Sequence, residues 1–362
     1  MKFMKSGGFL PFLIILLALT AFLAGYIMIG RGTGAIPKTG TILDKFSGSE
    51  PNANDLQPED EIKLSPISDR KVVSATNSLV GSQVIYFDRN GKIYEYDLEA
   101  KTEKTASDKV LPNFISAIWS PAKKEVLAIF TSETGLIFKY LNIATGKTIA
   151  LNPDIRSAAF SPDGNLIAYH RSDKTDSQNG GSIMVAQPDG QYSKKVLATR
   201  INDLAMSWPT KDAMAFKTPS QEIFLLAEDG KLNKFLDIKL GLEEKWSPNG
   251  NKLIFSALSG TPDEPAIDLM VKDVASKEEK KLAQVSASKC VWSIDSATIY
   301  CAIPKSPSVD EVYSINTLDG SQKIAAEPNM PVKNLLLSTL EDYLLFISAS
   351  DEKLYAIKTA SY

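Results

Sequence analysis

A motif built around a Ser-Pro turn recurs along the chain and limits the folds that are open to it. Its clearest copies, Phe160–Tyr169 and Trp246–Phe255, each join an aromatic residue, a Ser-Pro-Asp/Asn-Gly turn and an apolar run. Three weaker copies begin at Trp119, Trp208 and Trp292, so the lead aromatic residues are 41, 48, 38 and 46 residues apart. Spacings near this length are typical of propeller blades, each of which is a small four-stranded sheet.

The chemistry of the motif supports the same interpretation. The prolines Pro121, Pro162 and Pro248 fix φ at the first corner of a tight turn, and Gly164 and Gly250 can adopt the left-handed conformation that closes it. The residues after each turn are apolar on both alternating faces, as a strand buried on both sides requires. We therefore expect hairpins in blades that are stacked face to face, and the alternative is a β-sandwich with unrelated surface turns.

A second recurring element indicates how many units there are. Each buried strand is followed by a segment in which apolar residues alternate, and the seven segments are Lys92–Asp97, Leu136–Tyr140, Ser182–Ala186, Glu222–Leu226, Asp268–Val271, Glu311–Ile315 and Lys353–Ile357. Seven segments predict an all-β, seven-bladed propeller over residues 61–362. The first and last units lack the Ser-Pro turn, which leaves six or eight blades open. The last unit has residues for three strands, so we expect a strand near Glu61–Leu64 to complete it and close the ring.

The first sixty residues differ in composition from the rest. Phe9 to Ile29 is an uncharged and mostly apolar run, preceded by Lys2 and Lys5. A run of about 20 such residues suits a membrane-spanning helix. We expect residues 1–8 in the cytoplasm, an anchor over 9–30, a flexible polar linker over 31–60, and the propeller on the extracytoplasmic side. A cleaved signal peptide is the alternative, because Ala21 and Ala24 are small residues near the far end of the run.

The repeat resembles that of TolB-like propellers, which are related in shape to WD-repeat proteins. The resemblance rests on the lead residues Trp119, Phe160, Trp208, Trp246 and Trp292 with their turns, and it covers about 300 residues. It implies a bacterial envelope propeller that serves as a protein-binding platform without a conserved active site.

Known catalytic patterns are sparse in this sequence. The sequence has one histidine, His170, and no Gly-x-Ser-x-Gly motif that would place a nucleophilic serine for it. One histidine and two cysteines are also too few ligands for a zinc centre. Acidic clusters in the loops at Asp173–Asp176 and Asp263–Asp268 are better explained as solvated charge. With a net charge of -3 and dispersed lysines, the chain shows no nucleic-acid footprint. We therefore expect no catalysis, no cofactor and no metal.

The two cysteines flank the last copy of the turn. If that hairpin closes symmetrically, Cys290 and Cys301 lie opposite each other on neighbouring strands, close enough for a disulfide. Two buried free thiols are the alternative.

Two functions follow as hypotheses. The first is a membrane-tethered platform that binds a protein, peptide or other ligand in the cell envelope. The second is a carboxylate-based hydrolase or lyase that acts on an extracellular glycan or peptide in the propeller funnel, which needs acidic side chains there. The long loops Ser172–Gly181 and Ser259–Ala266 are the expected recognition elements.

Overall fold

The computed structural model describes residues 64–79, 81–133, 135–173, 180–227 and 229–359. These residues form an all-β, seven-bladed propeller, so the predicted fold and the predicted number of blades are confirmed. The anchor predicted at residues 9–30, the linker at 31–60 and the cytoplasmic residues 1–8 lie outside the described part. In that part no helix has the length and apolarity to cross a membrane.

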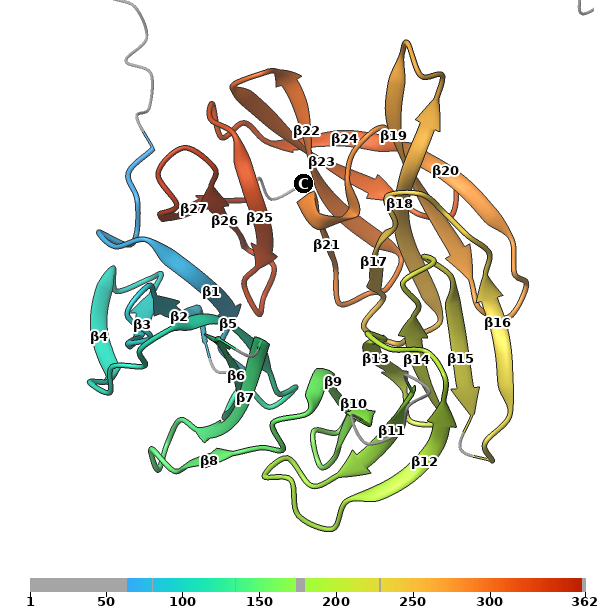
Figure 1. Ribbon diagram of the computed structural model, residues 1–362. Coiled ribbons are helices and arrows are strands. Elements are labelled where there is room, and N and C mark those ends of the chain that lie inside the picture. Colours follow the sequence, from blue (N-terminus) through green and yellow to red (C-terminus); the bar gives the residue numbers. More distant parts are fainter. Residues whose placement is uncertain (1–63, 80, 134, 174–179, 228, 360–362) are drawn as a thin grey trace, which may run out of the picture. The chain divides into compact units, whose positions relative to one another are not determined.

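Each blade is an antiparallel sheet in which the strands follow one another in chain order. The inner strands lie nearest the centre of the ring (Figure 1). They are β1 (Val72–Asn77), β5 (Phe114–Trp119), β9 (Ile155–Phe160), β13 (Ala205–Thr210), β17 (Glu243–Trp246), β21 (Cys290–Trp292) and β25 (Val332–Leu337). The second strands are β2 (Gln83–Asp88), β6 (Glu125–Ser132), β10 (Ile167–Asp173), β14 (Ala213–Lys217), β18 (Lys252–Gly260), β22 (Thr298–Ser306) and β26 (Tyr343–Ser348).

The outer half of each blade follows the same order. The third strands are β3 (Ile93–Asp97), β7 (Gly135–Asn142), β11 (Gly180–Ala186), β15 (Ile223–Ala227), β19 (Pro265–Asp273), β23 (Val309–Asn316) and β27 (Leu354–Lys358). The fourth strands are β4 (Thr102–Ser107), β8 (Thr148–Ala150), β12 (Lys194–Thr199), β16 (Leu232–Leu236), β20 (Glu279–Ala283) and β24 (Gln322–Ala326). A short 3-10 helix, η2 (Ala287–Lys289), precedes β21.

The core lies between the blades. Seven apolar clusters each join two neighbouring sheets, and one of them joins blade 7 to blade 1. The second strands are buried on both faces, as their unbroken apolar runs predict, and Leu253, Ile254 and Phe255 are all 0% exposed. This two-sided burial explains why consecutive residues of these strands are apolar.

The chain order gives the ring two different faces. Each inner strand begins on the face that also carries the connection from the second strand to the third, and we call this the entry face. The connection from the first strand to the second lies on the other side, which we call the hairpin face. The Ser-Pro turns of the repeat therefore all lie on the hairpin face.

The ring closes between blade 7 and the start of the described chain. Pro66 forms a bridge with Tyr355 of β27, and the Ile67 N–H donates to the Leu354 carbonyl at 2.8 Å. The Ser68 hydroxyl accepts from the Leu354 N–H at 3.0 Å. The closing contacts thus come from residues 66–68, whereas residues 61–63 of the predicted closing strand lie outside the described residues.

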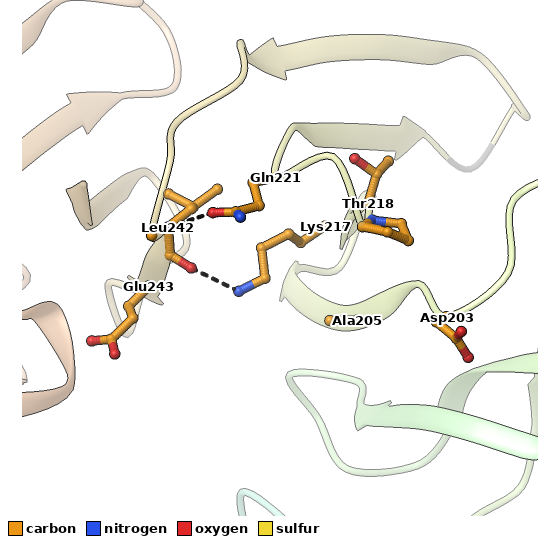
Figure 2. A pocket seen from close by; sticks show the side chains of 9 residues that line it. Asp203, Ala205, Lys217, Thr218, Gln221, Leu242 and Glu243 are labelled. Carbon is orange, nitrogen blue, oxygen red and sulfur yellow. Dashed lines mark hydrogen bonds between the residues drawn. The ribbon is translucent and has the colours of Figure 1, made fainter. Parts of the chain in front are cut away.

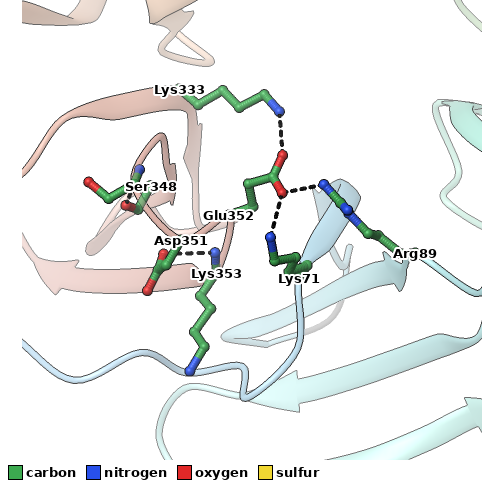
Figure 3. Close-up of polar contacts among 8 residues, drawn as sticks. Lys71, Arg89, Lys333, Ser348, Asp351, Glu352 and Lys353 are labelled. Atoms are coloured by element: carbon green, nitrogen blue, oxygen red, sulfur yellow. Dashed lines mark hydrogen bonds and ion pairs between the residues drawn. The ribbon is translucent and has the colours of Figure 1, made fainter.

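A cluster of charges spans the same seam on the entry face. Glu352 of blade 7 accepts from Lys71 at 3.2 Å and from Lys333 at 3.3 Å, and it also pairs with Arg89 of blade 1 (Figure 3). The three cations are more than half exposed, so each pair adds little to stability.

Candidate functional site

Two adjoining cavities lie on the entry face. One has a volume of about 450 Å³ and lies between blades 4 and 5, where Lys217 and Glu243 line it. The other has a volume of about 550 Å³ and reaches from blade 2 to blade 4, with Arg156 on its wall. Asp203 and Ala205 line both cavities, so they form the shared wall.

The shared wall has an unusual backbone. Asp203 has a φ of 59°, in the left-handed region that Asn and Asp adopt more readily than other residues with a side chain. The neighbouring Asn202 has a buried Oδ1 with no hydrogen-bond donor among the described residues, and it lines the larger cavity. Of these two features the unsatisfied polar atom marks this wall as a functional candidate, since left-handed residues also occur at other turns of the chain.

An ion pair crosses from blade 4 to blade 5 beside the smaller cavity. The Lys217 ammonium donates to Glu244 at 2.7 Å and to the Leu242 carbonyl at 3.1 Å. Gln221 accepts from the Leu242 N–H at 2.8 Å, which fixes the same segment from the other side. In Figure 2, Lys217 lies between Asp203 and Glu243, the two acidic residues that line this cavity.

The two carboxyl groups at the start of β17 titrate differently. Burial raises the pKa of Glu244 above its usual value, and the bond from Lys217 offsets this only in part. Burial also acts on Glu243, but hydrogen bonds from Ser286 and Ser288 outweigh it and lower the pKa of that group. Because alternate residues of a strand point to opposite faces of its sheet, Glu243 faces blade 6 and Glu244 faces blade 4.

Lys245, the next residue of β17, is also perturbed. Burial lowers the pKa of its ammonium to about 8, and the Nζ donates to the carbonyls of Ser288 and Cys290 in blade 6. Groups with shifted pKa values that lie together are typical of functional sites, although structural networks shift them too.

Arg156 differs from these lysines because it makes no ion pair within the residues that the structure describes. It is the residue after the first position of β9, and its guanidinium lies close to Gly135, where a Cβ would be 3.5 Å from Nη1. A guanidinium on a cavity wall without a carboxylate partner can bind a carboxylate or phosphate from a ligand through two parallel hydrogen bonds.

The residues of the sequence repeat lie away from these cavities. Trp119, Phe160, Trp246 and Trp292 end their inner strands at the hairpin face, and Trp208 lies near the end of β13. Of the expected recognition loops, Ser172 lines the larger cavity, whereas residues 174–179 lie outside the described part.

The loop from Ser259 to Ala266 forms the tip of a long hairpin. Its register pairs Ser259 with Ala266 and Gly260 with Pro265, so the strands β18 and β19 extend beyond the sheet on the entry face. At the base of this tip, the Leu258 N–H donates to the Leu240 carbonyl at 2.8 Å, which ties the hairpin to the segment before β17.

The cysteines form a disulfide. Cys290 and Cys301 are direct partners in the register of β21 and β22, and both are fully buried. The bond lies in the core between blades 5 and 6, so its role is structural.

The side chains that the structure describes form no metal-binding group. His170, the only histidine of the chain, is 0% exposed and packs so closely on Gly181 that a Cβ there would be 2.3 Å from its Nε2. No group of three or more His, Cys, Asp or Glu side chains able to hold a metal occurs in the described ranges.

Sequence reasoning did not single out Arg156, Asn202, Asp203, Lys217 or Glu243. They come from the start of inner strands, the end of a second strand and a connection between blades, and no motif links them. The signal available for Arg156 and Glu243 was a charged residue at the start of an inner strand, but Lys333 has the same place in blade 7, so this signal is not specific.

Comparison with solved structures identifies the fold. No family model matches the chain, and no curated protein matches its sequence. An oligogalacturonate lyase in complex with manganese has a TM-score of 0.60 at 15% identity, over 81% of this chain and 90% of that one. An oligogalacturonate lyase from Vibrio parahaemolyticus has a TM-score of 0.59 at 11% identity, over 83% and 93%. The RRP9 WD40 repeats have a TM-score of 0.58 at 9% identity, over 83% and 98%.

These likenesses confirm the propeller fold, which the chain shares with WD-repeat propellers. They also contradict the prediction that the chain is no enzyme, because two of the most similar structures are lyases. The prediction failed because it searched for known nucleophile and metal motifs, whereas a propeller enzyme gathers its site from separate blades.

Proposed function

We propose that the entry face binds an acidic oligosaccharide and cleaves it by β-elimination. The observation that carries the proposal is that Asp203 lies on the wall shared by two cavities, each of which holds one cation, Arg156 in one and Lys217 in the other. Two adjacent sugar units, each with a carboxylate, match this arrangement. The two lyase neighbours have the same fold, and their names state that they act on oligogalacturonate, an acidic oligosaccharide.

The chemistry of such a cleavage needs no water and no co-reactant. In a uronate unit the proton at C5 is acidified by the adjacent carboxylate, and a cation that neutralises this carboxylate makes its removal easier. A base takes the C5 proton, the electron pair forms a C4–C5 double bond, and the C4–O bond breaks. The leaving oxygen then takes up a proton.

The roles proposed for the described residues follow from their places. Arg156 would bind the carboxylate of one sugar unit. Lys217, which already pairs with Glu244 and donates to the Leu242 carbonyl, would give its third N–H to the carboxylate of the next unit. Asp203, between them, would be the base that takes the C5 proton. Since no metal-binding group of side chains occurs in the described ranges, no step is assigned to the manganese named in the first neighbour.

Incubation of the purified full chain with oligogalacturonate tests the proposal. An unsaturated product, detected by its ultraviolet absorbance and by mass spectrometry, is the expected result. Asp203→Asn should reduce the rate by at least about 100-fold. Asparagine also accepts a left-handed backbone, so the variant should fold. Asp319→Asn, on the hairpin face, is the matched control. Absence of the product, or an Asp203→Asn rate equal to that of the control, would refute the proposal.

Exposed apolar side chains favour a second candidate, a protein-binding platform on the same face. Beside the smaller cavity, Ile238, Leu240, Leu258 and Ile267 are 58%, 65%, 56% and 42% exposed. Apolar residues gathered on one surface are typical of interaction sites. Crosslinking in intact cells should capture a partner that the Leu240→Ser/Leu258→Ser variant loses, and unchanged capture would argue against this candidate.

The location of the propeller remains part of the proposal. An anchor over residues 9–30 would hold it outside the cytoplasm, in the envelope of a bacterial cell. The disulfide between Cys290 and Cys301 supports an oxidising surrounding.

A further inference from the structure

Three neighbouring turns of the hairpin face carry exposed apolar side chains. The turns join the first strand to the second in blades 6, 7 and 1, and their residues Ile294, Leu340 and Leu79 are 76%, 69% and 53% exposed. The Ser-Pro turns of blades 2, 3 and 5 have proline followed by a small or polar residue at these places. Exposed apolar side chains that gather on one part of a surface indicate an interaction site.

Hydrogen bonds hold the three turns together. The Ile294 N–H donates to the Glu341 carboxylate at 2.6 Å, and the Ser293 hydroxyl donates to the same group at 2.8 Å, which joins blades 6 and 7. On the other side, the Thr339 hydroxyl donates to the Ser78 carbonyl, which joins blades 7 and 1. The turns are therefore fixed side by side. We call their exposed apolar residues the apolar arc, which consists of Ile294, Leu340 and Leu79.

The shape of the apolar arc suits a lipid surface better than a protein. Ile294 lies between Ser293 and Asp295, and Leu340 lies between Thr339 and Glu341, so each apolar side chain stands alone among polar neighbours. Single side chains at the ends of turns can enter a fluid lipid layer one by one. A protein partner would need a complementary hollow for each of them.

The described chain begins on the same face, in the middle blade of these three. β27 runs from the entry face to the hairpin face, and Pro66 pairs with Tyr355 in the antiparallel sense. Leu64 therefore lies on the hairpin side of Pro66, and it packs against the same apolar cluster as Ile357. The chain before residue 64, which includes the proposed anchor, is joined to the propeller at this place.

Charges of both signs surround the apolar arc. The acidic residues of its turns are Asp295, Glu341 and Asp342, and lysines at the hairpin-face ends of strands in blades 5 to 7 include Lys252, Lys280 and Lys358. These carboxylates accept hydrogen bonds within or between the turns and keep their charge. Charge therefore does not select the occupant, and a neutral, zwitterionic lipid is the appropriate probe.

We propose that the apolar arc contacts a lipid bilayer, with its three side chains at the boundary between head groups and acyl chains. Contact through three side chains is weak and reversible, so it orients a propeller that is already tethered. The hairpin face then lies against the membrane, and the cavities of the entry face open away from it. The inference rests on the anchor proposed above and not on the proposed reaction.

Fluorescence quenching on the full chain tests the proposal. The two cysteines of the sequence form a buried disulfide, so an introduced cysteine is the only free thiol. A nitrobenzoxadiazole dye is attached to Leu340→Cys, and the chain is mixed with phosphatidylcholine vesicles that contain a spin-labelled lipid. Val110→Cys is the matched control, because Val110 is 51% exposed in a connection on the entry face. Quenching should be at least about twofold greater at residue 340 than at residue 110.

The outcomes separate this inference from the anchor. Quenching at residue 340 that does not exceed that at residue 110 would overturn the proposal in favour of a protein partner, whether or not the chain sediments with the vesicles. Sedimentation alone tests the anchor. Greater quenching at residue 340 in a chain that does not sediment would refute the anchor and support the contact of the apolar arc.

A second pair of variants shows whether the dye alone enters the lipid. With the dye at Leu340→Cys, Leu79→Ser/Ile294→Ser should remove at least about half of the quenching, because both neighbouring apolar side chains are lost. Val110→Ser/Ile201→Ser removes two exposed apolar side chains from the entry face and should keep it. Equal quenching of the two double variants would refute the proposal. Quenching that requires anionic phosphatidylglycerol would show attraction by charge and would refute it as well.

Discussion

The indole N–H of Trp119 lies 3.1 Å from the hydroxyl oxygen of Ser74, so blade 2 donates a hydrogen bond to the inner strand of blade 1. Trp208, at the corresponding position of blade 4, makes no such bond in the described part of the chain. The same residue type at one place in the repeat thus has two different surroundings.

Replacing each of these tryptophans by phenylalanine should reveal the difference. Trp119→Phe keeps the ring but removes the donor to Ser74, and we expect a loss of about 1 kcal/mol in the free energy of unfolding. Trp208→Phe removes a donor that has no acceptor, so its cost should be smaller. Urea unfolding of both variants provides the measurement, and a larger loss for Trp208→Phe would contradict the structure.

The buried ammonium of Lys245 should make stability depend on alkaline pH. Its pKa is about 8 in the folded chain against an ordinary 10.5, so between these values the unfolded chain binds more protons. Stability should therefore rise as pH increases through this range, by up to about 3 kcal/mol from this group. Lys245→Met should reduce the rise, whereas Lys323→Met, at an exposed position of β24, should not. The measurement is the free energy of unfolding in urea at several pH values from 7.5 upward. If it rises with pH as steeply for Lys245→Met as for the unaltered chain, this role is excluded.

The disulfide between β21 and β22 of blade 6 should stabilise the folded chain. Cys290→Ala/Cys301→Ala removes a bond that closes a loop with a sequence separation of 11 residues. We expect a loss of about 2–3 kcal/mol, measured by urea unfolding without reductant. A thiol assay of the unaltered, denatured chain should find no free thiol, and two reactive thiols would contradict the bond.

Residues 66–68, which bind blade 7 to the start of the propeller, should determine whether the ring stays closed. Ser68→Ala removes the acceptor for the Leu354 N–H inside a buried contact, and we expect a cost of about 1–2 kcal/mol. A chain that starts at Asp69 also loses the bond from Ile67 and leaves the edge of β27 open, so it should aggregate. A chain that starts at Lys63 is the control. Equal melting temperatures for the two shortened chains would contradict this closure.

The proposed anchor can be tested by fractionation. The full chain should sediment with membranes and be released by detergent but not by high salt, because a membrane-spanning helix is held by its apolar length. The chain that starts at Lys63 should stay in the soluble fraction. If the chain is found in the soluble fraction with its first 30 residues intact, the anchor is refuted. If the soluble chain lacks these residues, a cleaved signal peptide is favoured.

The fold was predictable because the blades impose a repeating pattern of apolar residues on the sequence. A strand that is buried on both faces needs consecutive apolar residues, and Leu253 to Phe255 show this pattern in sequence and in burial alike. Blades 1 and 7 lack the turn, yet their third strands kept the alternation that identified them. The closing contacts of the described part begin at Pro66, which carries no strand pattern of its own, whereas residues 61–63 of the predicted closing strand lie outside that part.

The candidate site was not predictable in the same way. Arg156 belongs to blade 3, Lys217 to blade 4 and Asp203 to the connection between these blades, and they line adjoining cavities only when the ring brings these segments together. Each of them alone is an ordinary surface charge in sequence. The cavity of about 530 Å³ between blades 3 and 4, on the hairpin face, was not predictable either, because a gap between blades depends on how their turns pack.

The bond between Ile67 and Leu354 makes the two ends of the propeller neighbours. In a ring that is closed in this way, any blade could come first in the chain. Linking residue 359 to residue 64 and cutting the chain at an exposed connection, such as the one at Asp108, should give a circular permutant with the same blades. In such a chain the order of synthesis would change while the cavities between blades kept their walls.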